Sequence, residues 1–394
     1  MQCDYFDRGE CRSCTLMGVP RARQLADKEA RARAAVPGEE VRWLPAFAGP
    51  EAAFRNKAKM VVGGTVEAPT LGILDAAQRG VDLSGCGITS EGLRAAFPAI
   101  RAFITAAGLV PYDVAARRGE LKHVLVTEAP DGALMARFVL RSTEALPRVR
   151  KHLPALREAL PRLAVATANI LPAHVALLEG DEEHVLTSND ALTMRVGELD
   201  LALPPRSFFQ TNTAVAAALY RQAAEWAEGA LRLGSASLRD PTGSLSERSE
   251  SKGAPARVWD LYCGVGGFAL ALAGPGREIV GVETSAEAIA AATRAGVPGT
   301  AFIADDATRW AREQPATQRP DLVVVNPPRR GLGPDLADWL ESSGVPTVIY
   351  SSCNPDTLAR DLARMPSYRA VEARPFDMFP QTEHLEVMVL LERV

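Results

Sequence analysis

Cys353 is the residue of this chain whose surroundings best suit covalent chemistry. It follows the short apolar run 347–350 and lies in the turn Ser351–Pro355, which reads Ser-Ser-Cys-Asn-Pro. A thiolate can act as a nucleophile when nearby donors or cations favour the ionised form. A lone cysteine is more often a packing residue, but this polar turn at the end of an apolar run favours catalysis. We therefore predict that Cys353 faces a ligand cleft and acts as a nucleophile.

A glycine-rich stretch with a downstream acid predicts a nucleotide-like ligand. Residues 260–268 read Asp-Leu-Tyr-Cys-Gly-Val-Gly-Gly-Phe and stand between an apolar run and a helical pattern. Glycines in such a turn let backbone amides approach a ligand closely. Glu283 comes nineteen residues after Gly264, where a carboxylate can accept hydrogen bonds from both ribose hydroxyls. NAD and S-adenosylmethionine sites share these features, and a structural turn is the alternative. Cys263 is interpreted as a packing residue.

Asn326 ends another apolar run. It follows residues 322–325 and precedes Pro327-Pro328, so the chain leaves the sheet abruptly at the carboxyl edge, where ligands bind in this architecture. Asn-Pro-Pro is typical of methyltransferases that act on planar nitrogenous groups or bases. A simple strand terminator is the alternative interpretation.

Candidate bases lie near the end of the chain. Glu386 and Glu383 stand on either side of His384 and Leu385. The neighbours of Glu386 are apolar, so in a strand its carboxylate points the opposite way, into a cleft. A thiol, a base and a methyl donor around one pocket fit the methylation of uracil at C5. Thiolate addition at C6 makes C5 nucleophilic, C5 takes the methyl group, and a base removes the C5 proton before the thiolate leaves.

Alternating strands and helices must position these residues. Helical patterns separate five short apolar runs, at 258–261, 278–282, 301–303, 322–325 and 347–350. This alternation predicts a parallel, doubly wound, Rossmann-like α/β sheet. A helix is expected from the caps Thr211-Asn212 to about Leu233. We assign residues 206–394 to this domain and interpret 235–255, rich in Ser, Arg, Glu, Gly and Pro, as a disordered surface insertion.

An α+β domain is predicted for residues 91–205. Helical patterns cover 91–108 and 144–160, and Asp131-Gly132 marks a hairpin between its two strands, 121–127 and 134–140. A second strand pair is expected at 164–171 and 174–178, which could continue through 184–187. No catalytic constellation falls in this region, so we interpret it as structural or substrate-binding.

Residues 1–90 are interpreted as an irregular segment organised by a ligand. They are rich in Arg, Lys, Gly and Cys, and a helical pattern is evident only near 21–35. If residues 54–60 form a strand, Arg55, Lys57 and Lys59 share one face. That face is either a solvated one or a phosphate-binding one.

Four cysteines gather in this segment: Cys3, Cys11, Cys14 and Cys86. Without an export signal, disulfides are less favoured than a metal site. The spacing forms neither the two close pairs of a typical zinc site nor the usual ferredoxin runs. It favours an iron–sulfur cluster over zinc, with four unligated thiols as a third possibility. It also departs from the Cys-x3-Cys-x2-Cys pattern of radical S-adenosylmethionine enzymes.

Length and composition exclude several classes of protein. The 394 residues exceed a typical domain, and 47% hydrophobic with 23% charged residues is typical of folded globular chains. The net charge of −4 excludes the global basic field of a histone-like binder, so a nucleic acid must be held by local patches. No leader-like N-terminus or long apolar stretch is evident, so we expect a soluble, cytoplasmic protein with no membrane partner.

The motifs together resemble the RNA uracil-C5 methyltransferases. The stretches that carry the resemblance are Met1–Cys3, Cys11–Cys14, Phe54–Met60, Ser207–Asn212, Asn326–Gly331, Ser351–Asn354 and Asp377–Pro380. They extend over nearly the whole chain. Tyr262 stands where close relatives often have Phe, which keeps an aromatic wall. The segment 235–255 departs from the family pattern, and we expect it to be dispensable.

The resemblance implies roles for individual residues. It implies that Cys353 is the nucleophile and that Glu386 takes the C5 proton. It implies an S-adenosylmethionine site lined by Gln210, Tyr262, Glu283 and Asn326. It implies a [4Fe–4S] cluster held by Cys3, Cys11, Cys14 and Cys86. Because methyl transfer needs no electron, such a cluster would fold the segment or shape the RNA surface, and residues 91–205 would bind RNA.

Two features of related enzymes bear on the choice of RNA substrate. Relatives that modify the other 23S ribosomal RNA site usually begin with a small β-barrel domain, and transfer-RNA members lack the four-cysteine set. The resemblance therefore implies that 5-methyluridine is formed in 23S ribosomal RNA at the 747-type site, with no obligate protein partner evident. The same chemistry on transfer RNA or on the other 23S uridine is the nearest alternative. A non-catalytic iron–sulfur RNA-binding protein is a rival of another class, and it would not require both Cys353 and Glu386.

Overall fold

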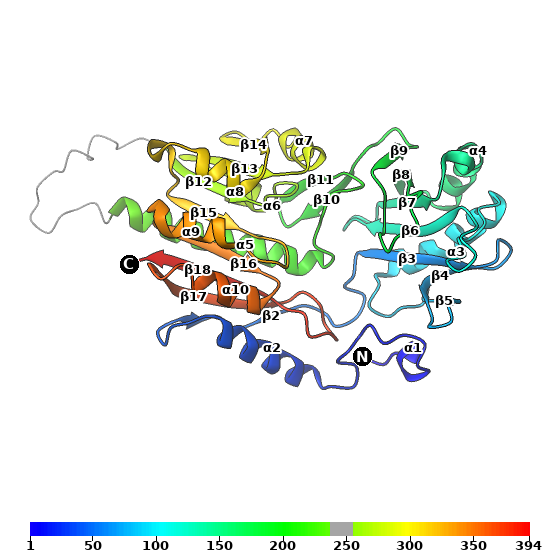
Figure 1. Cartoon of the computed structure of the whole chain (residues 1–394), viewed down its shortest axis with the longest axis horizontal. Helices are drawn as coiled ribbons and strands as arrows, with labels where there is room; N and C mark the ends of the chain where they lie inside the picture. Colours follow the sequence, from blue (N-terminus) through cyan, green and yellow to red (C-terminus); the bar gives the residue numbers. More distant parts are fainter. Residues whose placement is uncertain (237–254) are drawn as a thin grey trace, which may run out of the picture.

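Two large sheets lie side by side in the molecule (Figure 1). The structure is a computed structural model that describes residues 1–236 and 255–394. Residues 237–254, which make up most of the predicted insertion, lie outside the described residues. Within the described ranges, no helix has the length and apolar character needed to cross a membrane.

The nine-stranded sheet contains the predicted parallel strands. Its parallel part runs in the order β16-β15-β12-β13-β14. The strands are β12 (Ala256–Leu261), β13 (Arg277–Glu283), β14 (Thr300–Ala304), β15 (Leu322–Val325) and β16 (Thr347–Ser352). The helices are α5 (Thr213–Ala236), α6 (Gly267–Leu272), α7 (Ala286–Arg294), α8 (Ala307–Glu313), α9 (Pro334–Ser343) and α10 (Pro355–Leu362). The predicted Rossmann-like α/β architecture is confirmed.

The near-continuous apolar runs arise because helices cover both faces of this sheet. In β15, Val323 and Val325 pack on one face with residues of α8, α9 and α10, whereas Leu322 and Val324 pack on the other with residues of α5 and α6. All four side chains are fully buried. The runs thus place the strand ends, and the polar residues that follow them, at one edge.

Antiparallel strands extend the sheet on the β16 side. β18 (Glu386–Arg393) pairs with β16, and β17 (Tyr368–Asp377) pairs with β18. Two short strands from the N-terminal part, β1 (Arg42–Trp43) and β2 (Phe47–Ala48), pair with β17 in parallel. The C-terminal sheet is therefore completed by residues from the first fifty positions, which the sequence pattern did not predict.

The seven-stranded sheet runs in the order β5-β4-β3-β6-β7-β8-β9. Its strands are β3 (Lys57–Gly64), β4 (Pro69–Leu74), β5 (Gly80–Asp82), β6 (Leu121–Glu128), β7 (Leu134–Leu140), β8 (Leu163–Ile170) and β9 (Glu182–Val185). Helices α3 (Glu91–Ala106) and α4 (Leu146–Ala159) share one hydrophobic core with it. The predicted hairpin β6–β7 and both predicted helices are present.

Two expectations for this region are wrong. Residues 174–178 form no strand; the partner of β8 is β9, because the side chain of Asn169 binds Gly180 and holds 171–180 as a loop. The irregular interpretation of the first ninety residues fails for 57–82, where β3 to β5 join the sheet. The alternating residues Ala58, Met60 and Val62 are buried in its core, but glycines interrupt the pattern along the sequence.

A buried ionic network fixes the loop 171–181 to the sheet. Arg137 of β7 is only 1% exposed. Its guanidinium donates to both carboxylate oxygens of Glu183, at 3.0 and 2.6 Å, and to Glu179 at 2.6 Å. Thr167 and Asn169 also donate to Glu183. The buried charge of Arg137 is therefore fully paired, as burial of a cation requires.

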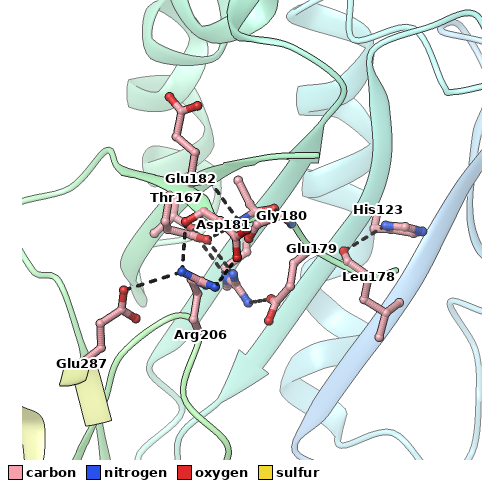
Figure 2. A network of polar contacts seen from close by, with 12 residues as sticks. His123, Thr167, Leu178, Glu179, Gly180, Asp181, Glu182, Arg206 and Glu287 are labelled. Atoms are coloured by element: carbon pink, nitrogen blue, oxygen red, sulfur yellow. Dashed lines mark hydrogen bonds and ion pairs between the residues drawn. The ribbon is translucent and has the colours of Figure 1, made fainter. Parts of the chain in front are cut away.

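The chain that joins the two sheets contacts elements on both sides through Arg206. Arg206 donates to the backbone oxygen of Asp181 at 3.0 Å and to its carboxylate at 3.1 Å, and lies 4.0 Å from Glu287 of α7 (Figure 2). The hairpin of β10 (Leu192–Val196) and β11 (Leu199–Leu203) packs with Met135 and Val165 of the seven-stranded sheet and with Leu270 and Ala288 of helices on the other. These contacts set the orientation of the two sheets.

The N-terminal segment runs beneath both sheets. α1 (Asp4–Asp7) lies near the seven-stranded sheet, and α2 (Arg21–Ala35) runs along β17 and α10 of the other (Figure 1). The helix predicted near residues 21–35 is confirmed.

Candidate active site

Four of the predicted functional residues lie at the carboxyl ends of neighbouring strands. Tyr262 follows β12, Glu283 ends β13, Asn326 follows β15, and Cys353 follows β16. The sheet order makes these strands contiguous. In open α/β sheets this edge is where ligands bind, so the strands bring the four residues to one ligand-binding edge.

Cys353 lines a small pocket. The pocket has a volume of about 190 Å³ and its wall consists of Arg31, Arg329, Cys353, Asn354, Pro355, Glu383, His384 and Leu385. The thiol is half-buried. Asn354 caps α10 by accepting a hydrogen bond from the backbone of Asp356, and its side chain donates to Arg329 O at 3.1 Å. These bonds hold the turn that presents Cys353.

Arg329 is the cation beside the thiol. The pKa of Cys353 is raised overall by burial and by the nearby Glu386, and the charge of Arg329 and a hydrogen bond from it act against this rise. Arg329 also binds the ring of His384, 2.7 Å from Nδ1. Burial and Arg329 lower the pKa of His384, which favours the neutral ring as an acceptor. Arg329 thus connects two walls of the pocket and favours the thiolate.

Glu386 lies next to Cys353 in the sheet register. Ser352 pairs with Val387 across the antiparallel β16–β18 pair, so one step further along this register Cys353 stands opposite Glu386. The carboxyl group is 2% exposed, and Ser351 donates to its Oε1 at 2.6 Å. Burial raises its pKa to about 7. Glu386 can therefore exchange a proton near neutral pH.

The glycine-rich turn leaves space for a ligand. Tyr262 and Gly264 have φ of +69° and +55°, and a Cβ built at Gly264 meets no atom within 4 Å. The Tyr262 ring is half-buried and its hydroxyl bonds with Thr308. Behind the turn, buried Asp260 accepts a hydrogen bond from Ala269 N through one oxygen, while its Oδ1 has no partner among the described residues. The open space at Gly264 leaves room for a ligand beside the turn.

Hydrogen bonds hold two other predicted cofactor residues in place. Glu283 accepts hydrogen bonds from Ser285 N at 3.0 Å and from the Thr284 hydroxyl at 2.9 Å, which orient its carboxylate at the end of β13. Gln210 is 9% exposed, and its backbone oxygen accepts a bond from Asn56 of the segment preceding β3. Asn212 caps α5. Cys263 is buried, consistent with its predicted packing role.

The N-terminal cysteines influence one another. All four are half-buried. Burial and the neighbouring Cys86, Cys11 and Cys3 raise the pKa of Cys14 to about 11. Yet, in the part of the chain that the structure describes, no set of three or more His, Cys, Asp or Glu side chains is arranged to hold a metal ion.

The basic stretch before β3 is arranged differently from the sequence expectation. Only Lys59 is exposed. Lys57 is buried, and burial together with Lys59 and Arg137 lowers its pKa to about 8. Arg55 is half-buried, and the charges of Cys86 and Cys14 act on its guanidinium. Arg55 therefore serves the cysteine segment and is not part of a solvated face.

Sequence patterns missed two residues of the pocket. Arg31 comes from α2, more than 300 positions before Cys353, and no local motif marks it. Arg329 is adjacent to the Asn-Pro-Pro motif, but its contact with His384 depends on the fold of residues 377–385. Both become visible only when the N-terminal helix and the C-terminal loop meet.

The fold and the site define a class of protein: a Rossmann-like α/β enzyme in which the carboxyl edge of the parallel sheet carries a pocket that contains a cysteine. A family model described as tRNA (Uracil-5-)-methyltransferase matches residues 317–394. The 23S rRNA (uracil(747)-C(5))-methyltransferases of Halothiobacillus neapolitanus and Salmonella enteritidis are 46% and 44% identical to the chain, with 100% of both sequences covered. That of Yersinia pseudotuberculosis is 43% identical, with 99% of each covered.

The chain therefore belongs to the family of 23S rRNA (uracil(747)-C(5))-methyltransferases. Its fold is also that of a solved structure, Pyrococcus abyssi tRNA (uracil-54, C5)-methyltransferase in complex with S-adenosyl-L-homocysteine. That likeness has a TM-score of 0.74 at 24% identity, and it covers 96% of this chain and 85% of the other.

Proposed function

We propose that this protein methylates C5 of a uracil in 23S ribosomal RNA, at the 747-type site, with S-adenosylmethionine as methyl donor. The full-length relatives support the substrate and the reaction. The structural observation that carries the chemistry is the position of Cys353, on a pocket wall and opposite Glu386 in the strand register.

Cys353 begins the reaction. Its thiolate forms a bond to C6 of the uracil, and the electrons of the C5–C6 double bond shift to give an enolate with a nucleophilic C5. Arg329 favours the thiolate through its charge and hydrogen bond. S-adenosylmethionine, when bound, supplies the methyl group that C5 takes up.

Glu386 completes the reaction. After methylation C5 still carries its proton, and the ionised carboxylate of Glu386 accepts it. The electrons of the C5–H bond restore the double bond, and the C6–S bond breaks, so Cys353 leaves as a thiolate. A pKa of about 7 suits this role, because the group is ionised in a large fraction of molecules near neutral pH and can release the proton to water.

The crevice beside the glycine-rich turn is the proposed cofactor site. Glu283 would accept hydrogen bonds from the ribose hydroxyls of the cofactor, and Tyr262 would form an aromatic wall of the site. Asn326 and Gln210 would line the end of the crevice toward Cys353. The open space at Gly264 supports this assignment, since a side chain there would project into the crevice.

We further propose that Cys3, Cys11, Cys14 and Cys86 hold a [4Fe–4S] cluster. Thiolates are the usual ligands of such clusters. The mutual effect of the thiols on Cys14 and the half-buried Arg55 guanidinium, on which the charges of Cys14 and Cys86 act, support it, because a cation there offsets the negative charge of a thiolate-ligated site. The residues fit the group in donor type and number.

The RNA is proposed to lie over the rim of the Cys353 pocket. Four exposed arginines lie on this pocket or next to it: Arg31 and Arg329 line the pocket, Arg330 follows Arg329, and Arg360 donates to the backbone oxygen of Arg330. Such groups bind backbone phosphates. The target base must leave its stack to enter the pocket, so a loop nucleotide is the expected substrate. We propose that the domain with the seven-stranded sheet contacts parts of the RNA that lie farther from the target base.

The function is tested by mapping 5-methyluridine in 23S ribosomal RNA from a strain that lacks the gene. We expect the modification at the 747-type uridine to disappear and to return when purified protein and S-adenosylmethionine are added to the unmodified RNA. Loss of a 5-methyluridine in transfer RNA, with the ribosomal one retained, would overturn the proposed substrate.

A further inference from the structure

One wall of the catalytic pocket is held from outside by the N-terminal segment. Residues 378–385, here called the pocket loop, connect β17 to β18 and contribute Glu383, His384 and Leu385 to the pocket of Cys353. Glu386 follows immediately. The geometry around the nucleophile and the base therefore depends on what fixes this loop.

Gln381 is the most firmly held residue of the pocket loop. It is 2% exposed and has a φ of +65°, which is unfavourable for a residue other than glycine and persists only where contacts enforce it. Its backbone N–H donates to Gln24 Oε1 at 3.0 Å, and its side-chain Oε1 accepts from Gln24 Nε2 at 3.0 Å. Two reciprocal bonds thus join residues 357 positions apart.

Gln24 and Gln381 are also hydrogen-bonded to the residues that follow Cys14. Leu16, two residues after Cys14, donates its N–H to Gln381 O at 3.0 Å. Gln24 is fully buried, and its Nε2 also donates to Leu16 O and Val19 O, at 3.3 and 2.8 Å. The chain between Cys14 and α2 is therefore tied to the pocket loop through both backbone and side-chain groups.

Other contacts support the loop from the same side. Lys28 donates to Asp377 at 2.6 Å and to Phe379 O at 3.0 Å, and Arg21 forms an ion pair with the same Asp377. Arg31 donates to Glu383 O at 2.7 Å. All three cations lie on α2, so an intact N-terminal segment presents them together.

We propose that Gln24 and Gln381 form a joint through which the cysteine segment positions the catalytic pocket. This inference rests on the proposed function, since the pocket is taken to be the uracil site. It assigns the cysteine segment a structural purpose: when residues 3–16 are ordered, the pocket loop is held in the conformation that places His384 against Arg329 and Glu386 beside Cys353. Both glutamines are positioning residues.

Two variants test the joint without removing a catalytic group. Gln381→Gly deletes the side-chain bonds of Gln381 to Gln24 and to Glu51, keeps its backbone N–H bond to Gln24, and accepts the positive φ. Gln24→Met fills the same volume and removes the bonds of Gln24. Gln222→Met is the matched control, because Gln222 is 3% exposed and hydrogen-bonded to Glu225 and Arg374 on a different face. Each is made in the full-length protein.

Hydrogen exchange is the first readout. We expect amides of residues 379–385 to exchange about tenfold faster or more in both joint variants, since each loses buried hydrogen bonds, and at the parent rate in the control. We expect the same amides to exchange faster in Cys14→Ala as well. Unchanged protection of these amides in both joint variants, or equal loosening in the control, would overturn the joint.

Methyl transfer is the second readout. We expect kcat to fall about tenfold or more in the joint variants while the affinity for S-adenosylmethionine stays within about twofold, because none of the proposed cofactor residues, Gln210, Tyr262, Glu283 and Asn326, belongs to the loop. A loosened loop with a parent-like kcat would overturn the positioning role. If the parent protein itself does not methylate uracil, the proposed function fails, whereas the exchange experiment still reports on the joint.

Discussion

Cys353 and Glu386 stand opposite each other where β16 ends and its antiparallel partner β18 begins. The register that pairs Ser352 with Val387 places them there, and the ionised carboxylate raises the pKa of the thiol. A base this close can reach the ring carbon next to the one that the thiolate attacks. The two groups also oppose each other electrostatically, which makes Arg329 necessary as the compensating cation.

Replacement of the nucleophile should stop the reaction. Cys353→Ala removes the only group proposed to activate C5, so we expect methylation to fall by on the order of 10³-fold or more. S-adenosylmethionine affinity, measured by calorimetry, should remain near that of the parent because the thiol adjoins the crevice without forming it. A variant with near-parent turnover would show that C5 is activated in another way.

The reactivity of Cys353 should depend on Arg329. Arg329→Ala removes the cation and the hydrogen bond that lower the thiol pKa, so fewer molecules carry the thiolate at neutral pH. We expect alkylation of Cys353 by iodoacetamide, followed by peptide mass spectrometry, to slow several-fold. Arg330→Ala is the control, since Arg330 is exposed and is not among the groups that shift this pKa. Equal rates in the two variants would contradict the role of Arg329.

Glu386 should make catalysis pH-dependent near neutrality. Burial raises its pKa to about 7, so below that pH the protonated group cannot accept the C5 proton. We expect the methylated covalent adduct to accumulate in the parent protein as the pH falls from 8 to 6, measured by denaturing electrophoresis with labelled RNA. An adduct level that does not change across this range would argue against Glu386 as the base.

The burial of Glu386 should also make the free energy of unfolding depend on pH. A carboxyl group whose folded pKa is raised contributes stability that is full below its unfolded pKa and is lost as pH rises through the folded value. The free energy of unfolding of the parent, relative to Glu386→Gln, should therefore decline between about pH 4.5 and 7 and level off above. The comparison cancels other groups that titrate there, such as Asp260, whose pKa burial also raises to about 7.

The cysteine segment should carry iron. Protein purified without oxygen should be brown and contain about four irons per chain. Cys14→Ala should lose most of them, whereas Cys263→Ala should retain them, because Cys263 belongs to the glycine-rich turn. Zinc as the sole bound metal would overturn the cluster.

The strand ends were predictable from the sequence because a parallel sheet brings them together. Apolar runs mark buried strands, and the polar residue after each run must lie at the carboxyl edge. That reasoning located Glu283, Asn326 and Cys353 on the correct edge. It depends only on local patterns and on one topological rule.

The rest of the pocket depends on contacts that no local pattern encodes. Arg31 and Gln24 reach the pocket loop from α2, across about 350 positions. The alternation of residues 54–60 indicated a possible strand, but the place of β3 (Lys57–Gly64) in a seven-stranded sheet was not predicted, because glycines at 63 and 64 end the alternation after a few residues. Such features follow from the packing of distant segments, which a single sequence does not reveal.

The covalent mechanism is tested most directly with Glu386→Gln. The variant keeps Cys353 and the shape of the site but cannot take the C5 proton, so the adduct should form, accept the methyl group and stop. Mass spectrometry of the denatured protein–RNA complex should show uridine bound to Cys353 through C6 and carrying one added methyl. Complete turnover without a trapped adduct, or an adduct at another residue, would contradict the account.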